Sequence, residues 1–267
     1  MCIRDSISGG GVLYSEAEQE LSKFAKKHNI PVTSTVMGIG CMTKDDPYYI
    51  SAVGALGEGS SNSLSKDTDL ALAIGTKLAD FTTGSWANFE NPNFKLVSVN
   101  TARYDTTKHL ATPVISDAKV GLQKISEALG DWKASDDWYK RAIKEKNEWD
   151  AYVEKQSGPT NQEEPSYAHA VGAVYRNSDP SDIVVTAAGG LVGEVVQVWK
   201  PKQLNTFETE WGFSCMGYEI SGALGIKMAK PDQDVVVFVG DGSYLLNNTD
   251  IYSSVIYDQK LIIIVCD

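Results

Sequence analysis

The residues best suited to chemistry lie near the end of the chain, where an apolar run gives way to glycine. Val235–Val239 is followed by Gly240-Asp241-Gly242-Ser243, and the residues after them suit a helix. Glycines let the backbone approach a ligand closely, and the N–H groups at a helix start attract a phosphate. Asp241 could hold Mg²⁺ against that phosphate, because Mg²⁺ prefers oxygen ligands. A plain strand-to-helix turn with Asp241 as its N-cap fits the same residues.

The segment after Gly242 favours the ligand-binding interpretation. One helix and one strand are expected next, and 24 residues (243–266) separate Gly242 from Asp267. This arrangement resembles the motif of thiamine-diphosphate enzymes, in which Gly-Asp-Gly is followed further along by a pair of residues ending in Asn. In that family the acid and the Asn bind the metal that anchors the diphosphate. Asp241 matches the acid and Asp267 the first member of the pair, and the Asn would be the next residue.

A second segment, Trp211–Gly225, resembles the same family and precedes the strand that ends at Gly240. In the family it supplies an apolar side chain that bends the cofactor, and Met216 fits that role. The tip of an earlier strand, Ala187–Leu191, resembles a loop near the diphosphate. The resemblance thus implies Asp241 as the metal ligand and a set of ten cofactor contacts: Ala188, Gly189, Gly190, Ser214, Cys215, Met216, Gly240, Asp241, Gly242 and Ser243.

Two residues beside this segment stay open. Glu219 lies one helical turn from Met216 and is an active-site carboxylate by position only, so a surface or supporting role fits it as well. Cys215 has no basic neighbour in the sequence, which favours a small core residue over a nucleophile. The Glu that activates the cofactor in the family comes from an N-terminal domain that no residue here matches. We therefore expect no catalytic residue within this chain.

The elements that must position these residues alternate between apolar runs and amphipathic stretches, which is typical of α/β proteins with parallel sheets. We predict two Rossmann-like domains with mainly parallel sheets, joined by a polar helix and linker. Residues 1–131 resemble the central domain of the family, residues 132–165 the helix and linker, and residues 166–267 the diphosphate-binding domain. Gly9-Gly10-Gly11 lacks the GxGxxG spacing, so a structural role is favoured there over nucleotide binding.

The two ends of the chain are unusual for a complete domain. The strand before Gly9 contains few apolar residues, whereas buried parallel strands are usually apolar runs. The chain also stops at Asp267, at the end of a strand, where such folds place a functional loop. These features predict a fragment in which Met1–Ser6 are not native.

Composition narrows the class of protein. The chain has 267 residues, 42% of them hydrophobic, and a formal net charge of −11, which disfavours binding to nucleic acid. Apolar runs are far shorter than the roughly 20 residues of a membrane span, and no signal peptide is evident. Four scattered cysteines indicate a reducing compartment, so we expect a cytoplasmic protein with a small-molecule substrate, as a homodimer or homotetramer in its full-length form.

Within the family, three segments resemble the branch that hydrolyses trihydroxycyclohexane-1,2-dione in inositol catabolism: Asp80–Ser85, Phe213–Ile220 and Gly240–Asn247. The resemblance implies an enzyme dependent on thiamine diphosphate and Mg²⁺ that cleaves a C–C bond of a cyclic 1,2-dione, inactive as this fragment. The acetolactate synthase or 2-oxoacid decarboxylase branch remains an alternative. A cofactor-binding or subunit-interaction module without catalysis remains another.

Overall fold

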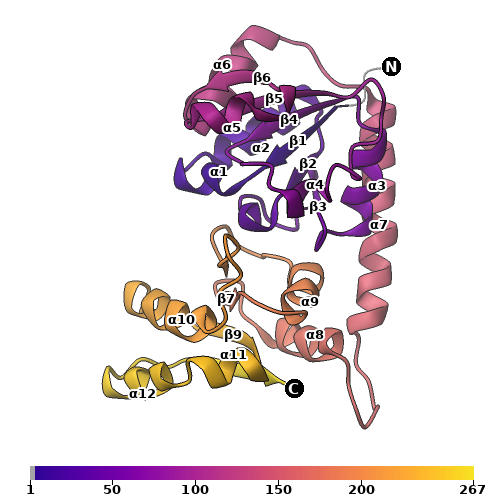
Figure 1. Cartoon of the computed structure of the whole chain (residues 1–267). Coiled ribbons are helices and arrows are strands. Elements are labelled where there is room, and N and C mark those ends of the chain that lie inside the picture. Colours follow the sequence, from indigo (N-terminus) through magenta and orange to yellow (C-terminus); the bar gives the residue numbers. More distant parts are fainter. Residues whose placement is uncertain (1–3) are drawn as a thin grey trace. The chain divides into compact units, whose positions relative to one another are not determined.

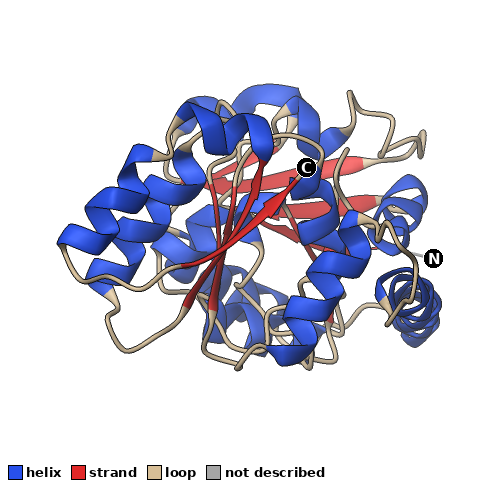
Figure 2. Cartoon of the chain, turned by 90° about the horizontal axis from the view of Figure 1, so that it is seen from below, coloured by secondary structure: helices blue, strands red, loops and turns tan. Residues whose placement is uncertain are grey.

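The chain forms two compact units, each built on one parallel sheet with helices on both faces (Figures 1 and 2). A computed structural model describes residues 4–267. The first unit ends at Tyr152 and the second begins at Val153, within the polar helix α7 (Asp136–Ser157). The predicted fold class, α/β with parallel sheets, is confirmed. Residues 1–3, with Cys2, lie outside the described part.

The sheet of the first unit has the order β3-β2-β1-β4-β5-β6, and every neighbouring pair is parallel. This is the order of the Rossmann fold, with its switch point between β1 and β4. The strands are β1 (Arg4–Ser8), β2 (Val32–Ser34), β3 (Tyr49–Ala52), β4 (Leu70–Ile74), β5 (Lys95–Asn100) and β6 (Thr112–Ile115). The helices are α1 (Gly10–Tyr14), α2 (Glu18–His28), α3 (Gly59–Asp67), α4 (Asp80–Thr83), α5 (Arg103–Thr107) and α6 (Ala118–Leu129), followed by α7.

The central strand β1 is polar but buried, which explains why it contains few apolar residues. Asp5 is 3% exposed, and its carboxylate accepts hydrogen bonds from Trp138 Nε1 (3.1 Å) and Thr68 Oγ1 (2.8 Å). These donors offset part of the cost of burying a carboxylate. They also tie α7, which carries Trp138, to the centre of the sheet. Arg4-Asp5-Ser6 is therefore part of the fold's central strand.

Glycines close the switch point of the first unit. A Cβ atom added at Gly11 would lie 2.6 Å from Gly75 Cα, so the two backbones already touch. The N–H groups of Gly9 and Gly11 donate to the carbonyl oxygens of Ile74 (2.8 Å) and Gly75 (2.9 Å). These amides are thus engaged inside the protein, and Gly9-Gly10-Gly11 serves close packing of α1 against β4.

The second unit has a four-stranded parallel sheet in the order β10-β9-β7-β8. Its strands are β7 (Ile183–Thr186), β8 (Phe207–Thr209), β9 (Val235–Gly240) and β10 (Ile262–Cys266). Its helices are α8 (Tyr167–Asn177), α9 (Leu191–Val198), α10 (Tyr218–Ala229), α11 (Asp241–Leu246) and α12 (Thr249–Ile256). In Figure 1, α8 and α9 lie on one side of the sheet, and α10 and α12 on the other.

Two helices, rather than the single predicted helix, connect β9 to β10. The break falls at Asn247-Asn248, between α11 and α12. Asn247 Nδ2 donates to Ser221 Oγ (2.5 Å) and to the carbonyl oxygen of Gly217 (3.3 Å), which anchors the break to α10. Among residues 4–267, no helix is both long enough and apolar enough to cross a membrane.

Candidate functional site

A cavity opens at the switch point of the second sheet. After β7 the chain turns to β8 on one side, and later it returns to β9 and β10 on the other, so the carboxyl ends of β7 and β9 diverge. Such crevices are where open parallel sheets bind ligands. The cavity has a volume of about 180 Å³ and is lined by Tyr167, Ala188, Gly189, Gly190, Leu191, Met216, Gly240, Asp241, Gly242 and Ser243.

Three separate segments predicted from the sequence meet at this cavity. They are the loop after β7, the segment before α10, which contributes Met216, and the junction of β9 with α11. Ser214 and Cys215 are not among the described residues that line it. Tyr167 and Leu191 also line it: Leu191 ends the predicted Ala187–Leu191 loop but was not among the predicted contacts, and nothing in the local sequence of Tyr167 indicates a ligand. Both follow from position alone: Tyr167 begins α8 and Leu191 begins α9.

The loop after β7 leaves room for a ligand. Gly189 has φ +79°, a conformation that favours glycine, and apart from adjoining residues of the chain no described residue has an atom within 4 Å of a Cβ added at Gly189 or Gly190. Gly190 is the N-cap of α9, so the unpaired N–H groups of that helix start at the cavity. A helix start with open space before it fits an anionic group such as a diphosphate.

Asp241 brings a carboxylate to the opposite wall. It is the first residue of α11, and Gly240 is the N-cap, so the interpretation of Asp241 as an N-cap is wrong. Asp241 is exposed and lines the cavity, where its oxygens can reach a hard cation. Within the described residues, no group of three or more His, Cys, Asp or Glu could hold a metal by itself. A cation here would therefore take further oxygen ligands from other groups, such as the phosphates of a bound cofactor.

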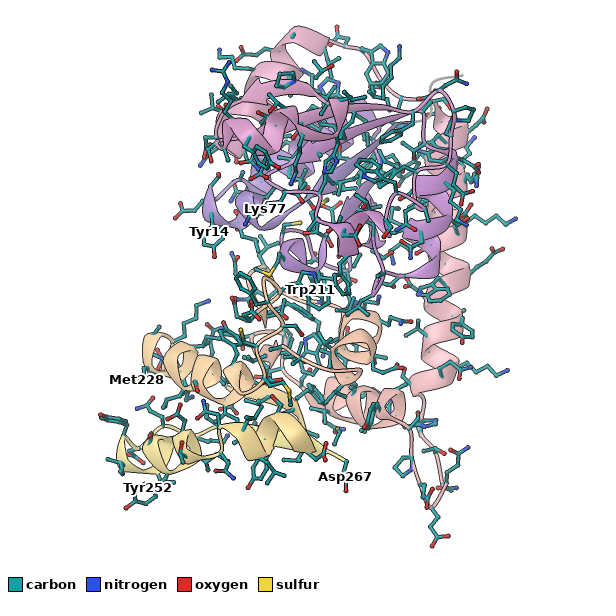
Figure 3. The ribbon with its side chains drawn as sticks, viewed as in Figure 1. Tyr14, Lys77, Trp211, Met228, Tyr252 and Asp267 are labelled. Carbon is teal, nitrogen blue, oxygen red and sulfur yellow. The ribbon has the colours of Figure 1, made fainter. Side chains whose placement is uncertain are left out.

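Met216 supplies the apolar part of the lining. Its Cε lies 3.3 Å from the position of a Cβ added at Gly242, so the side chain reaches across the turn after β9. Met216 is 49% exposed. A second exposed methionine, Met228, lies near the end of α10 (Figure 3). An exposed apolar side chain at a cavity rim is a surface that an organic ligand can cover.

The segment before Met216 is shaped by Glu210. Its carboxylate accepts hydrogen bonds from the N–H groups of Phe213 (2.9 Å) and Cys215 (2.7 Å). Burial acts to raise the pKa of Glu210, but these backbone donors outweigh it and hold the pKa below its usual value. Cys215 is exposed, so the interpretation of this residue as a small core residue is wrong. The hydrogen bond to Glu210 holds its backbone at the surface.

Glu219 is completely buried, so a surface role for this residue is also wrong. Its carboxylate lies behind the cavity, where it contacts Ala188, Gly217 and Ser243. The second unit thus combines an open switch point, a free helix start, an acidic residue and an apolar side chain. The fold and the site together define an α/β protein with a cavity suited to a phosphorylated organic ligand.

Comparisons with known proteins identify the cofactor class. Residues 7–125 match the model of the thiamine pyrophosphate enzyme central domain, and residues 187–267 match that of the C-terminal thiamine pyrophosphate-binding domain. The chain belongs to the thiamine pyrophosphate enzyme family. All predicted cofactor contacts fall within the second matched region.

Several curated relatives share one name. The chain is 35% identical to the 3D-(3,5/4)-trihydroxycyclohexane-1,2-dione hydrolases of Geobacillus thermodenitrificans (strain NG80-2) and Clostridium tetani (strain Massachusetts / E88), over 98% of this chain and 44% of each relative. It is 31% identical to the enzyme of the same name from Lacticaseibacillus casei, with the same coverage. The chain spans less than half the length of these relatives.

Proposed function

We propose that this chain carries the diphosphate-binding part of an enzyme that uses thiamine diphosphate and Mg²⁺ to hydrolyse a C–C bond of trihydroxycyclohexane-1,2-dione. The observation that carries the proposal is the meeting of Asp241, Met216 and the Gly189–Gly190 loop around one cavity at a switch point. The names of the relatives support the substrate. On this proposal the enzyme acts in inositol catabolism, as a cytoplasmic homo-oligomer.

Each wall of the cavity has its own task in this proposal. Asp241 holds Mg²⁺, and the start of α9 at Gly190 receives the diphosphate with its N–H groups. Met216 contacts the organic part of the cofactor and orients it. Thiamine diphosphate supplies a nucleophilic carbon for attack on a carbonyl group, while the protein binds and orients it.

The residues that lie on this chain bind and orient, and none of them is proposed to transfer a proton to the substrate. Asp241 is exposed at the cavity and suits a cation, while the buried Glu219 is covered by its own hydrogen bonds. The acid that activates the cofactor would come from outside the described residues. A cofactor-binding role without catalysis therefore remains the second candidate for the chain alone.

Turnover tests the proposal. The complete gene product that contains this chain should open the ring of trihydroxycyclohexane-1,2-dione when it is supplied with thiamine diphosphate and Mg²⁺. Chromatography of the products measures the ring opening. Asp241→Asn should abolish the activity. Met228→Ala, a control substitution at an exposed position of α10, should retain it. Release of CO₂ from pyruvate without ring opening would instead assign the acetolactate synthase or decarboxylase branch.

A further inference from the structure

One carboxylate connects the walls of the cavity from behind. Glu219 lies in the first turn of α10 and is completely buried. Its Oε1 accepts a hydrogen bond from Ala188 N (3.1 Å), in the loop after β7. Its Oε2 accepts from Ser243 Oγ (2.7 Å), in the first turns of α11, and from Gly217 N (3.0 Å) at the start of α10.

The partners of Glu219 are next to the residues proposed to bind the cofactor. Ala188 precedes the Gly189–Gly190 loop, and Ser243 follows Asp241 and Gly242. Gly217, with φ +93°, directly follows Met216, and its N–H also donates to Ser243 Oγ (2.7 Å). Three segments that are distant in sequence are therefore joined through a single side chain.

In the described part of the chain, three groups hydrogen-bond to the Glu219 carboxylate, and each of them is a donor. Two are backbone N–H groups and the third is the hydroxyl of Ser243, whose own oxygen is already an acceptor for Gly217 N–H. A carboxylate, which has acceptor atoms only, satisfies all of them, and bonds of this kind are stronger than those between neutral groups. A buried carboxylate is tolerated only when it is hydrogen-bonded in this way. The arrangement is therefore specific for an acid at position 219.

We infer that Glu219 is the positioning residue of the cofactor site: it holds the Gly189–Gly190 loop, Met216 and the Asp241 turn at the spacing that a diphosphate cofactor requires. The inference rests on the proposed function, since it concerns the same cavity. Glu219 acts through Ala188, Gly217 and Ser243 and touches neither cofactor nor substrate. This positioning role explains why α10 has an acid at position 219, although the other buried residues of this helix are mostly apolar.

Substitution of Glu219 by glutamine distinguishes a positioning role from a role in packing alone. Glu219→Gln keeps the shape of the side chain but replaces one acceptor with an NH₂ donor. If the NH₂ faces Ala188, two donors oppose each other there; if it faces Gly217, the same conflict arises at Gly217. In the first orientation the Ala188 N–H loses its acceptor; in the second the Ser243 hydroxyl loses its acceptor and the Gly217 N–H retains only Ser243 Oγ.

The first test reads the walls directly in the ligand-free chain. Hydrogen exchange of the Ala188 and Gly217 amides is followed by NMR, and at least one of the two should exchange at least about tenfold faster in Glu219→Gln than in the unchanged chain. Glu18→Gln, the same substitution at a buried glutamate of the first unit, should leave both rates unchanged. Equal protection of both amides in the unchanged chain and in Glu219→Gln would overturn the inference.

The second test measures binding of magnesium thiamine diphosphate by calorimetry. Glu219→Gln should weaken binding by about tenfold or more, with an unchanged number of sites. A merely structural defect would lower the number of competent sites and leave the Kd of the folded molecules unchanged, which would contradict a positioning role. No binding by the unchanged chain would instead refute the cofactor site itself. Equal Kd values in the two proteins would leave the cofactor site standing and remove Glu219 from it.

Discussion

The two units of this chain place glycines at equivalent points of their sheets and use them differently. In the first unit, Gly11 and Gly75 touch each other, and the local amides donate to carbonyl groups of the neighbouring strand. In the second unit, Gly189 and Gly190 face open space and belong to a cavity wall. A glycine-rich loop after a strand therefore does not by itself make a phosphate site. The candidate site lies where the strands leave the crevice open in front of a helix start.

The largest effect expected from this difference concerns stability. Gly11→Ala should destabilise the first unit by more than about 3 kcal/mol, because the added methyl group meets backbone atoms of Gly75 at 2.6 Å and backbone cannot move aside cheaply. Gly190→Ala, in open space and with negative φ, should change stability by less than about 0.5 kcal/mol. Urea unfolding of both variants measures this difference, and similar losses at the two positions would contradict it.

The second prediction concerns the pH dependence of the first unit. Burial raises the pKa of Asp5 from 3.8 to about 6, although hydrogen bonds from Thr68 and Trp138 act to lower it. The folded state thus binds this proton more tightly than the unfolded chain. Stability should fall as the pH rises from about 4 to about 6, by about 3 kcal/mol in total, and then level off.

Asp5→Asn should remove this fall. Asparagine can still accept from Trp138, and its amide can donate to Thr68 Oγ1, whose hydroxyl also donates to the carbonyl oxygen of Leu64 (3.0 Å). Asp137→Asn, an exposed change in the same region, should retain it. Calorimetric unfolding between pH 4 and 7 separates the variants, and an unchanged slope in Asp5→Asn would rule out this carboxyl as the source.

The third prediction addresses the open cavity. Asp241→Asn should weaken binding of thiamine diphosphate in the presence of Mg²⁺ by about a hundredfold, or about 2.7 kcal/mol, because an amide is a poorer ligand for the cation than a carboxylate. Without Mg²⁺ the variant and the unchanged chain should bind equally weakly. Isothermal titration with and without the metal measures both values. A loss of equal size in the absence of Mg²⁺ would argue against a role in metal binding.

The smallest effect belongs to the apolar wall. Met216→Ala should weaken binding of thiamine diphosphate by about tenfold and leave the thermal stability nearly unchanged, because the side chain is half-exposed and packs mainly over Gly242. Met228→Ala removes a similarly exposed methionine of α10 and should not alter binding. Equal affinities of the two variants would show that Met216 makes no contact with the cofactor.

The elements that could be predicted from the sequence share one property, which is a strong hydrophobic pattern. The apolar patterns predict a strand over Lys95–Asn100, a helix over Ala118–Leu129 and a strand over Asp234–Val239. β5 and α6 have those bounds, and β9 (Val235–Gly240) begins and ends one residue later. The strands that were not predicted are β3, β6 and β8, and all of them lie at sheet edges. Each of these three strands has only three or four residues, and β6 contains Pro113, so their sequences lack the apolar run that marks longer strands such as β9.

For the site, local sequence indicated what the glycines and Asp241 could do, because the chemistry of a turn after a strand depends on a few neighbouring residues. The role expected of Met216 came from the resemblance to the family. Local sequence did not identify Tyr167 as a lining residue, and it left the role of Glu219 open. Those roles depend on which distant segments meet at one cavity, and no local pattern records that.

The sequence by itself determined the fold class, the parallel arrangement of the strands and the family motif, because hydrophobic periodicity and turn chemistry are local properties. Tertiary structure alone decided which glycine loop is closed and which is open, since Gly11 and Gly75 are 64 residues apart and meet only when β1 pairs with β4. It also decided that Glu219 is a buried link and that Asp5 is a buried acid. In each case the cause is the same: burial and hydrogen-bond partners are set by segments that folding brings together.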